Sequence, residues 1–319
     1  MKVLVTGASG FVGSALCGNL IARRLTTTGI VRHFPANPLP GVDYQIVSGF
    51  SKSKFWKEIL VGVDVVVHCA ARAHVMRDSE KDPLAVYREV NVEGTRNLAE
   101  QAASCGIKRF IYISSIKVNG EETSEHPFKA DDIPAPEDSY GISKWEAEQV
   151  LQKIAYDSKL EIVIIRPPLV YGPEVRANFL KLMKLVKSGL PLPFGAIHNS
   201  RSFVALDNLV DLILICLDHP AAINQTFLVS DGDDLSTAEL LRRTAKAFGK
   251  SSRLIPVPVF LLRTAALLLG KTDFAQRLCG SLQIDISKAK QLLGWTPKVS
   301  VDDALLKTTK HFLKNNERN

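Results

Sequence analysis

The sequence lacks the features that mark several classes of protein. Its 319 residues contain five scattered cysteines and no Cys-x-x-Cys pair, which predicts reduced thiols, no disulfide framework and no metal site. No apolar run approaches the roughly 18 residues of a membrane span. The first residues form no cationic region followed by an apolar core and a cleavage site, so we expect no signal peptide and a cytoplasmic protein.

The charge lacks the clustering of a nucleic-acid-binding protein. The net charge is +7, but the basic residues are dispersed and do not alternate with aromatic residues. We therefore expect no nucleic-acid partner, and interpret the charge as a solvated surface together with an anionic small ligand. Hydrophobic residues make up 46% and charged residues 23% of the chain, a balance typical of a globular protein.

Short apolar runs alternate with helical patterns in the first half of the chain. This alternation predicts an α/β fold with a doubly wound parallel sheet, in which ligands bind at the carboxyl edge of the strands. The predicted strands are 2–6, 27–32, 64–68, 108–114, 160–166 and, later, 225–230, and the predicted helices between them are 15–24, 82–104 and 140–156.

The second half of the sequence predicts mainly helices, at 178–188, 207–218, 236–248, 257–269, 286–293 and 301–314. We expect residues 1–167 to form a nucleotide-binding domain to which 202–231 return. Residues 168–201 and 232–319 then form a smaller, mostly helical substrate lobe. The apolar segment Val257–Leu269 contains Arg263. Lobe core is the favoured interpretation, and a membrane-surface or oligomer contact is the alternative.

A glycine turn joins the first strand to the first helix. Gly7, Gly10 and Gly13 let the backbone approach a pyrophosphate at the helix N-terminus. This context predicts a Rossmann dinucleotide site. The predicted cofactor-binding residues also include Phe11 and Val12 between the glycines, and Ala70 and Ala71 after the strand 64–68.

Arg32 stands at the end of the second predicted strand, where an acidic residue would bind the adenosine ribose and favour NAD. A guanidinium suits a 2′-phosphate. Arg32 therefore favours NADP(H) as the cofactor, with NAD as the alternative. An arginine stacked on adenine, or simply exposed to solvent, is the other interpretation of this position.

Tyr140 and Lys144 are four residues apart on a predicted helix and so share a face. An ammonium beside a phenol favours the phenolate, which makes Tyr140 a candidate general acid and base. An exposed Tyr/Lys pair is the alternative. The cofactor site that the preceding sequence predicts supports the catalytic interpretation of this spacing.

In combination, the motifs resemble the extended short-chain dehydrogenase/reductases that act on nucleotide sugars, the UDP-galactose 4-epimerase type. They occur in family order: the glycine turn, Ala70-Ala71, Asn91–Thr95, Ser114-Ser115, Tyr140-x-x-x-Lys144 and Arg166–Pro173. The resemblance implies that Ser115 bonds the sugar C4 oxygen and that Tyr140 exchanges its proton. Lys144 is implied to lower the pKa of Tyr140 and to hold the nicotinamide ribose, and Asn91 to order the neighbouring strand.

The resemblance also implies a UDP-sugar substrate and further binding residues. Arg201 matches an arginine that grips the diphosphate, and Asn178 matches a residue at a helix start that binds the same group. Arg277 is a second diphosphate candidate, with a surface arginine as the alternative. His74 could reach the sugar or be an ordinary loop histidine. A homodimer through the helices 82–104 and 140–156 is the implied assembly.

The reaction depends on the residues that follow Ser115. Dehydratases of the family carry a Thr-Asp-Glu set, where this chain has Ser115, Ile116 and Lys117, so we do not expect a dehydratase. Arg32 favours a reductase. The segments Ser115–Glu121, Arg166–Gly172 and Gln276–Ser281 resemble bacterial proteins of O-antigen clusters, for which reduction of UDP-2-acetamido-2,6-dideoxy-hexos-4-ulose to UDP-N-acetylquinovosamine is implied.

The sequence therefore predicts a UDP-4-ketosugar reductase. A UDP-glucose or UDP-N-acetylglucosamine 4-epimerase is the alternative within the same fold. A non-catalytic dinucleotide sensor is the alternative of another class, which the Ser115, Tyr140 and Lys144 set disfavours because a sensor needs no proton donor.

Overall fold

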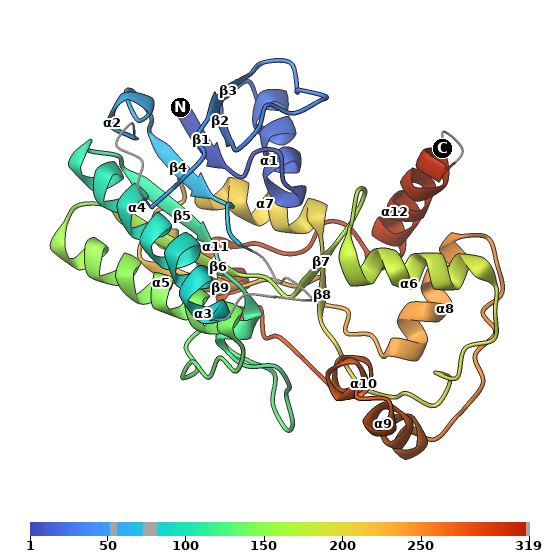
Figure 1. Ribbon diagram of the computed structural model, residues 1–319. Coiled ribbons are helices and arrows are strands. Elements are labelled where there is room, and N and C mark those ends of the chain that lie inside the picture. Colours follow the sequence, from blue (N-terminus) through green and yellow to red (C-terminus); the bar gives the residue numbers. More distant parts are fainter. Residues whose placement is uncertain (52–55, 73–81, 317–319) are drawn as a thin grey trace.

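The computed structural model describes residues 1–51, 56–72 and 82–316. A seven-stranded sheet forms its centre (Figure 1), in the order β3-β2-β1-β4-β5-β6-β9. Every pair is parallel, as the sequence predicts. The strands are β1 Lys2–Thr6, β2 Thr26–Val31, β3 Val42–Ile46, β4 Val65–His68, β5 Arg109–Ile113, β6 Glu161–Arg166 and β9 Gln225–Leu228.

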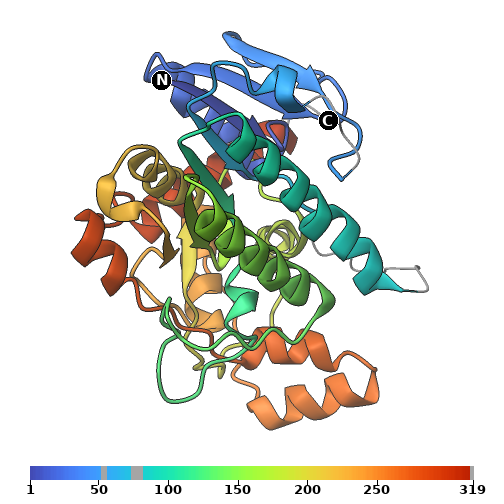
Figure 2. The ribbon, with the colours of Figure 1, turned by 90° about the vertical axis from the view of Figure 1, so that its left-hand side faces the viewer.

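Helices cover both faces of this sheet (Figure 2). On one face lie α1 Phe11–Ala22, α7 Leu206–Cys216 and α11 Ser287–Leu293; on the other lie α2 Trp56–Ile59, α4 Gly94–Ser104 and α5 Ser139–Asp157. Alternation along β1 supplies both cores. Val3 and Val5 join the first core and Leu4 joins the second, because successive side chains of a strand point to opposite faces.

Three elements replace the single helix predicted over 82–104. They are α3 Pro83–Tyr87, a π-helical segment η1 Arg88–Glu93, and α4. Asp82 accepts a hydrogen bond from the Ala85 amide at the start of α3. π-Helical turns of this kind occur often at functional sites, and η1 carries Asn91, whose contacts are described below.

The second lobe has a core of its own. Three helices, α6 Ala177–Ser188, α8 Thr237–Ala247 and α12 Val301–Asn316, pack around a parallel pair of short strands, β7 Leu169–Tyr171 and β8 Phe203–Ala205. The remaining short elements are the 3-10 turns η2 Ile116–Val118 and η3 Pro220–Ala222. Helix α7 and strand β9, within 202–231, pack on the sheet or pair with it, and α11, which lies in the range predicted for the lobe, also packs on the sheet.

The outermost elements are α9 Val259–Leu268 and α10 Thr272–Cys279, which pack against each other at the bottom of Figure 1. None of the residues of α9 is buried. The favoured interpretation of Val257–Leu269 as lobe core is therefore wrong. The apolar run predicted burial, but α9 lies on the outside of the lobe. No helix of the described chain has both the length and the apolar character to cross a membrane.

Candidate active site

The glycine turn lies at the carboxyl edge of the sheet. Gly7 has a φ of +66°, and the Gly10 amide donates to its carbonyl over 2.8 Å. A Cβ on Gly13 would stand 2.2 Å from the Gly7 oxygen, so the turn requires glycine there. Helix α1 follows with no side-chain cap and no acidic residue in its first turn. Its free amides therefore offer an anion site.

The second part of the predicted cofactor site packs against this turn. A Cβ on Gly7 would lie 3.0 Å from the Ala70 amide nitrogen, and that amide donates to the Thr6 hydroxyl over 3.1 Å. Ala71 follows at the same edge. Phe11 and Val12 are half-buried and pack against the core. The structure thus brings the predicted cofactor residues of the glycine turn and of the β4 end together.

Arg32 is exposed one residue beyond the end of β2. The Ala8 amide donates to the Ile30 carbonyl over 3.2 Å, which holds the end of β2 beside the glycine turn. Among the described residues, no hydrogen bond or ion pair engages the Arg32 guanidinium. Its position suits contact with the adenosine end of a dinucleotide, and its selectivity between NADP and NAD stays a prediction.

Ser115 and Tyr140 meet through a hydrogen bond between their side chains. Ser115 caps η2 directly after β5, and Tyr140 lies in the first turn of α5. Asp138 fixes that turn, because its carboxylate accepts the Gly141 amide over 2.7 Å. Two residues 25 positions apart in the sequence therefore present their hydroxyls to one point at the carboxyl edge of the sheet.

The pKa of Tyr140 lies above its usual value of 10. Burial is the main cause, Asp138 and Tyr87 act in the same direction, and the Ser115 hydrogen bond opposes them. The implied lowering by Lys144 is not what this structure shows, since burial outweighs every favourable contact of the phenolate. Tyr140 is therefore a neutral phenol here, the form that can donate a proton.

Lys144 is buried beneath this pair. Its ammonium donates to the Ile113 carbonyl over 2.7 Å and to the Tyr112 hydroxyl over 3.1 Å, and it lies 4.2 Å from the centre of the Tyr112 ring. Burial lowers its pKa to about 7, while Glu148 acts in the opposite direction. Lys144 can therefore gain or lose its proton near neutral pH, a property that unburied lysines lack.

A buried chain of hydrogen bonds, which the sequence did not predict, runs behind the cofactor turn. His68 contacts the Thr6 hydroxyl through Nδ1 over 2.6 Å and the Thr95 hydroxyl through Nε2 over 3.0 Å. The Thr95 hydroxyl donates its hydrogen to the Asn91 carbonyl. It can therefore only accept from His68, which means that Nε2 of His68 carries the ring proton. Burial lowers the pKa of His68 to about 3, with Lys144 acting in the same direction, and the ring stays neutral.

Asn91 connects the turn after β4 to the catalytic helix. Its side chain accepts the Arg72 amide over 2.8 Å, and its amide group donates to the Arg72 carbonyl and to the Ser143 hydroxyl. These contacts agree with the ordering role that the family resemblance implies. The π-helical turn places this side chain between α5 and the end of β4.

A buried ion pair, also missed in the sequence, fixes the Ser115 loop to α5. Glu148 is fully buried and pairs with Arg166 over 2.6 Å. Arg166 also donates to the Asn119 side chain over 2.9 Å, and Ser114 donates to Glu148. Glu148 lies four residues after Lys144, on the same helix face. That spacing was visible in the sequence, but Arg166 as its partner was not.

The two residues after Ser115 provide no carboxylate. Ile116 is buried, and the Lys117 ammonium pairs with Glu121 over 2.6 Å and with Asp138 over 2.5 Å. The acid and base that a dehydratase needs at these two positions are therefore replaced by an apolar side chain and a cation that is already paired.

Two of the predicted diphosphate residues lie near each other. Arg201 donates to the Gly280 carbonyl over 2.9 Å. Burial lowers its pKa, the nearby carboxylates Glu121 and Glu122 act in the opposite direction, and Arg277 acts in the same direction as burial. Two guanidiniums that repel each other suit an anionic ligand. Asn178 is exposed in the first turn of α6, and no described contact joins it to the arginines. His74 lies outside the described residues.

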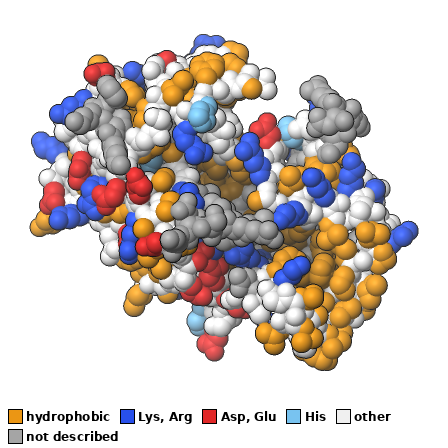
Figure 3. Space-filling model, viewed as in Figure 1, with side chains coloured by type: hydrophobic (Ala, Val, Ile, Leu, Met, Phe, Trp, Pro, Cys, Tyr) orange, Lys and Arg blue, Asp and Glu red, His pale blue; other side chains and the backbone are white. Residues whose placement is uncertain are grey.

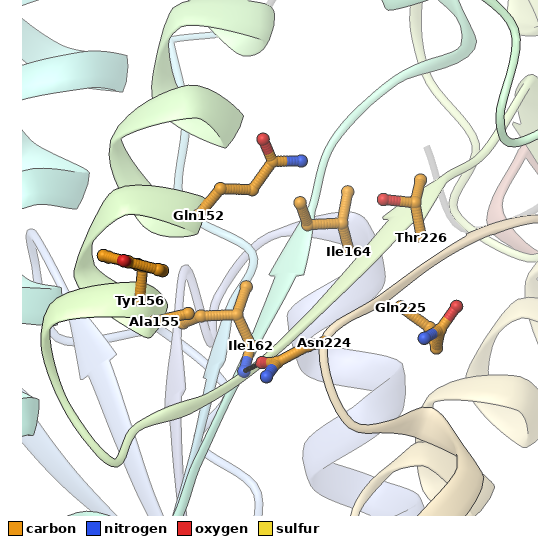
Figure 4. Close-up of a pocket in the computed structure, with 8 residues that line it drawn as sticks. All are labelled: Gln152, Ala155, Tyr156, Ile162, Ile164, Asn224, Gln225 and Thr226. Carbon is orange, nitrogen blue, oxygen red and sulfur yellow. Dashed lines mark hydrogen bonds between the residues drawn. The ribbon is translucent and has the colours of Figure 1, made fainter.

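Two surface depressions lie away from these residues. Figure 4 shows one, with a volume of about 220 Å³, where the C-terminal half of α5 meets β6 and β9 near Tyr156 and Gln225. The other, of about 540 Å³, runs between η1 and α5 past Arg88 and Glu146. Neither contains a predicted site residue. The described residues contain no cluster of His, Cys, Asp and Glu able to hold a metal.

Comparison with known proteins adds a family and several relatives. A family model described as "NAD dependent epimerase/dehydratase family" matches residues 3–230. A Vibrio cholerae protein named UDP-glucose 4-epimerase is 50% identical, over 99% of this chain and 97% of its own length. An Escherichia coli O157:H7 protein named N-acetyl-alpha-D-glucosaminyl-diphospho-ditrans,octacis-undecaprenol 4-epimerase is 30% identical, over 82% of this chain and 77% of its own.

Solved structures share the fold. The Thermotoga maritima UDP-glucose 4-epimerase with UDP-glucose superposes with a TM-score of 0.80 at 24% identity, covering 99% of this chain and 100% of that one. The Bacillus cereus UDP-glucuronic acid 4-epimerase with NAD superposes with a TM-score of 0.79 at 24% identity, over 99% of both chains. At this identity the likeness extends to the fold alone.

Proposed function

The chain belongs to the NAD-dependent epimerase/dehydratase family of short-chain dehydrogenase/reductase enzymes, and from this premise we propose that it inverts C4 of a UDP-hexose or UDP-N-acetylhexosamine. The observation that carries the proposal is the hydrogen-bonded pair Ser115 and Tyr140, with Lys144 buried below it at the carboxyl edge of the sheet. The Vibrio cholerae relative named UDP-glucose 4-epimerase supports the same reaction.

The residues of the glycine turn fit a dinucleotide, because their backbone and the open start of α1 favour a pyrophosphate. A nicotinamide cofactor, when bound, accepts and returns the hydride at C4. Ser115 donates to the C4 oxygen and Tyr140 exchanges the proton of that oxygen, which stabilises the charge that develops there. Arg201 and Arg277 pair with the diphosphate of the sugar nucleotide.

A UDP-4-ketosugar reductase is the second candidate, and two observations favour it. Arg32 stands exposed at the end of β2, where a 2′-phosphate would meet it. The raised pKa of Tyr140 keeps the phenol protonated, and a reduction consumes that proton. The Vibrio cholerae relative and the NAD dependence of the family favour the epimerase instead. Preference for NADP(H) and formation of UDP-N-acetylquinovosamine stay predictions of the reductase.

One experiment separates the two candidates. The purified chain is denatured, and the released dinucleotide is identified; the native chain is then assayed for UDP-glucose and UDP-N-acetylglucosamine epimerisation without added cofactor. Retained NAD with epimerisation supports the epimerase. Oxidation of added NADPH by a UDP-4-keto sugar supports the reductase. An absence of both reactions with every UDP-sugar tested contradicts both candidates.

Tyr140→Phe tests the shared chemistry. We expect turnover to fall about 10²–10⁴-fold, the usual contribution of a general acid or base. Tyr156→Phe is the matched control, since Tyr156 lies on the same helix and is 91% exposed, and it should leave turnover unchanged. Wild-type turnover in the Tyr140→Phe protein would remove Tyr140 from the mechanism.

The assembly is a further part of this proposal. The implied homodimer would form through α3, η1 and α4 together with α5. This face carries the Arg88–Glu146 ion pair and the groove beside it. Glu146→Arg replaces the ion pair with two like charges on this face. It should lower the mass measured by light scattering from that of a dimer to that of a monomer. An unchanged mass would place the interface elsewhere.

A further inference from the structure

The pair α9 and α10 forms an apolar surface that neither the fold nor the proposed reaction uses. We define the outer surface by the exposed apolar residues of this pair and of the segment before it. Its members, with exposed fractions, are Ile255 at 50%, Phe260 at 66%, Leu261 at 48%, Leu267 at 67%, Leu268 at 82%, Leu269 at 70% and Phe274 at 59%. Figure 3 shows a broad hydrophobic area over these elements.

Most residues of helix α9 are apolar, yet most of them are exposed. It contacts α10, and its partly covered residues Val259, Leu262 and Ala266 follow a helical spacing. The leucines and phenylalanine of its other faces remain in solvent. Contiguous apolar surface on this scale marks a contact site in most proteins.

The charge around the outer surface identifies the kind of partner. The sequence 249–280, which includes all of α9 and α10, has one acidic residue, Asp273, against five basic ones, Lys250, Arg253, Arg263, Lys271 and Arg277. Arg253, Arg263 and Lys271 are exposed beside the apolar residues. Figure 3 shows Lys and Arg side chains at the margin of the hydrophobic area. An apolar face bordered mainly by cations is complementary to an anionic lipid surface.

The neighbouring elements extend this character. The Leu192 amide donates to the Arg253 carbonyl, and the Ile255 amide donates to the Leu192 carbonyl, both over 2.8 Å. These bonds place the end of α6 beside the segment 253–255. Leu190, two residues before Leu192 and 61% exposed, adds one apolar side chain.

A second copy of the chain fits this surface less well. A two-fold contact would bring the same cations of both copies together, and the sequence 249–280 offers Asp273 as its one carboxylate against five cations. An anionic bilayer satisfies both parts of the surface, because the acyl region takes the leucines and the headgroups take the guanidiniums and ammoniums.

We propose that α9 and α10 dock the protein on the surface of a membrane that contains anionic phospholipid. The leucines and phenylalanines enter the boundary between headgroups and acyl chains, and the flanking cations pair with lipid phosphates. The active-site residues Ser115 and Tyr140 take no part in this contact, although α10 also carries Arg277, the diphosphate candidate.

Cosedimentation with vesicles tests the proposal. The full chain is mixed with phosphatidylcholine vesicles, with or without about 30% phosphatidylglycerol, and the bound fraction is measured at low and at high salt. We expect binding to the anionic vesicles only, and a loss of at least about tenfold in affinity at high salt, where the headgroup charge is screened. No binding to the anionic vesicles overturns the proposal.

Two variants address the two halves of the surface. Leu267→Ser with Leu268→Ser should weaken vesicle binding at least about tenfold, because each exposed leucine that enters the bilayer contributes to partitioning. Arg263→Glu with Lys271→Glu should abolish it. The matched controls lie in the nucleotide domain: Val61→Ser with Ile46→Ser, which are 70% and 60% exposed, and Arg23→Glu with Lys57→Glu.

The outcomes separate the membrane from a second copy. Controls that bind like the wild type, with both surface variants weakened, support docking. Unchanged binding of either surface variant overturns it. Light scattering of the same proteins without vesicles completes the test. A wild-type oligomer that the leucine variant dissociates, with no vesicle binding, assigns the outer surface to a protein interface instead and overturns the proposal.

Discussion

The nucleotide domain and the outer helices of the second lobe use apolar residues in opposite ways. Every residue of β4 is buried, and His68 at its end forms part of a closed hydrogen-bond chain. The equally apolar α9 buries no residue. The difference lies in the neighbours, since β4 lies between two strands and two helix layers, whereas α9 packs mainly on α10. Hydrophobicity of a segment therefore does not by itself predict its burial.

The largest expected change in stability is at Glu148, in the interior of the nucleotide domain. Glu148→Gln should destabilise the chain by about 3–5 kcal/mol, because it leaves the Arg166 guanidinium buried without its counterion. Glu146→Gln, two residues away, removes a surface partner of Arg88 and should cost about 0–1 kcal/mol. Urea unfolding of both variants measures the difference. Equal losses would show that the buried pair does not hold the Ser115 loop.

Two leucine truncations test the contrast directly. Leu4→Ala should cost about 2–5 kcal/mol, since Leu4 is fully buried in β1. Leu268→Ala, at a side chain that is 82% exposed, should change the free energy of unfolding by less than about 0.5 kcal/mol. Chemical denaturation gives both values. A large loss at Leu268 would mean that α9 is covered in solution by another part of the assembly.

Acid should weaken the nucleotide domain through His68. The pKa of His68 is about 3 in the fold and 6.5 in an unfolded chain, so the unfolded state binds the extra proton between these values. The free energy of unfolding should therefore fall as the pH drops from about 6.5 towards 3. His68→Asn should flatten this slope in urea titrations at several pH values. The exposed His33→Asn should leave it as in the wild type, and an unaltered slope in both would contradict the closed network.

Alkali should act in the opposite direction through Lys144. Its pKa is about 7 in the fold and 10.5 when unfolded, so the unfolded state binds more protons in this window. Stability should rise with pH between about 7 and 10.5. Thermal unfolding of Lys144→Met should show less of this rise, whereas Lys153→Met, exposed on the same helix, should retain it. A rise of the same size in Lys144→Met would assign it to other groups.

Local patterns predicted the elements whose burial follows from their own residues. Strands β1, β4 and β5 are continuous apolar runs, and the glycine turn has a spacing that only a strand-to-helix turn explains. The edge strand β3 escaped prediction, although its apolar residues Val42, Tyr44 and Ile46 alternate with Asp43 and Gln45, a pattern that indicates a strand at the edge of a sheet. The short strands β7 and β8 pair across some 30 residues of sequence, which no local pattern encodes.

The residues of the candidate site also fall into two groups, those that the sequence predicted and those that it missed. Tyr140, Lys144, Ser115 and the glycines were predicted from type and spacing, and the structure brings Ser115 and Tyr140 together. Glu148 and His68 were missed. Their partners Arg166 and Thr95 lie 18 and 27 residues away, and only the packed fold makes them neighbours.

The sequence by itself determined the parallel sheet, the dinucleotide turn and the order of the family motifs, because each depends on residues close along the chain. The tertiary structure alone decided three further properties: the burial that keeps Tyr140 protonated, the proximity of Arg201 and Arg277, and the exposure of α9. Each of these depends on which distant segments exclude water from a side chain, and that exclusion exists only once the chain has packed.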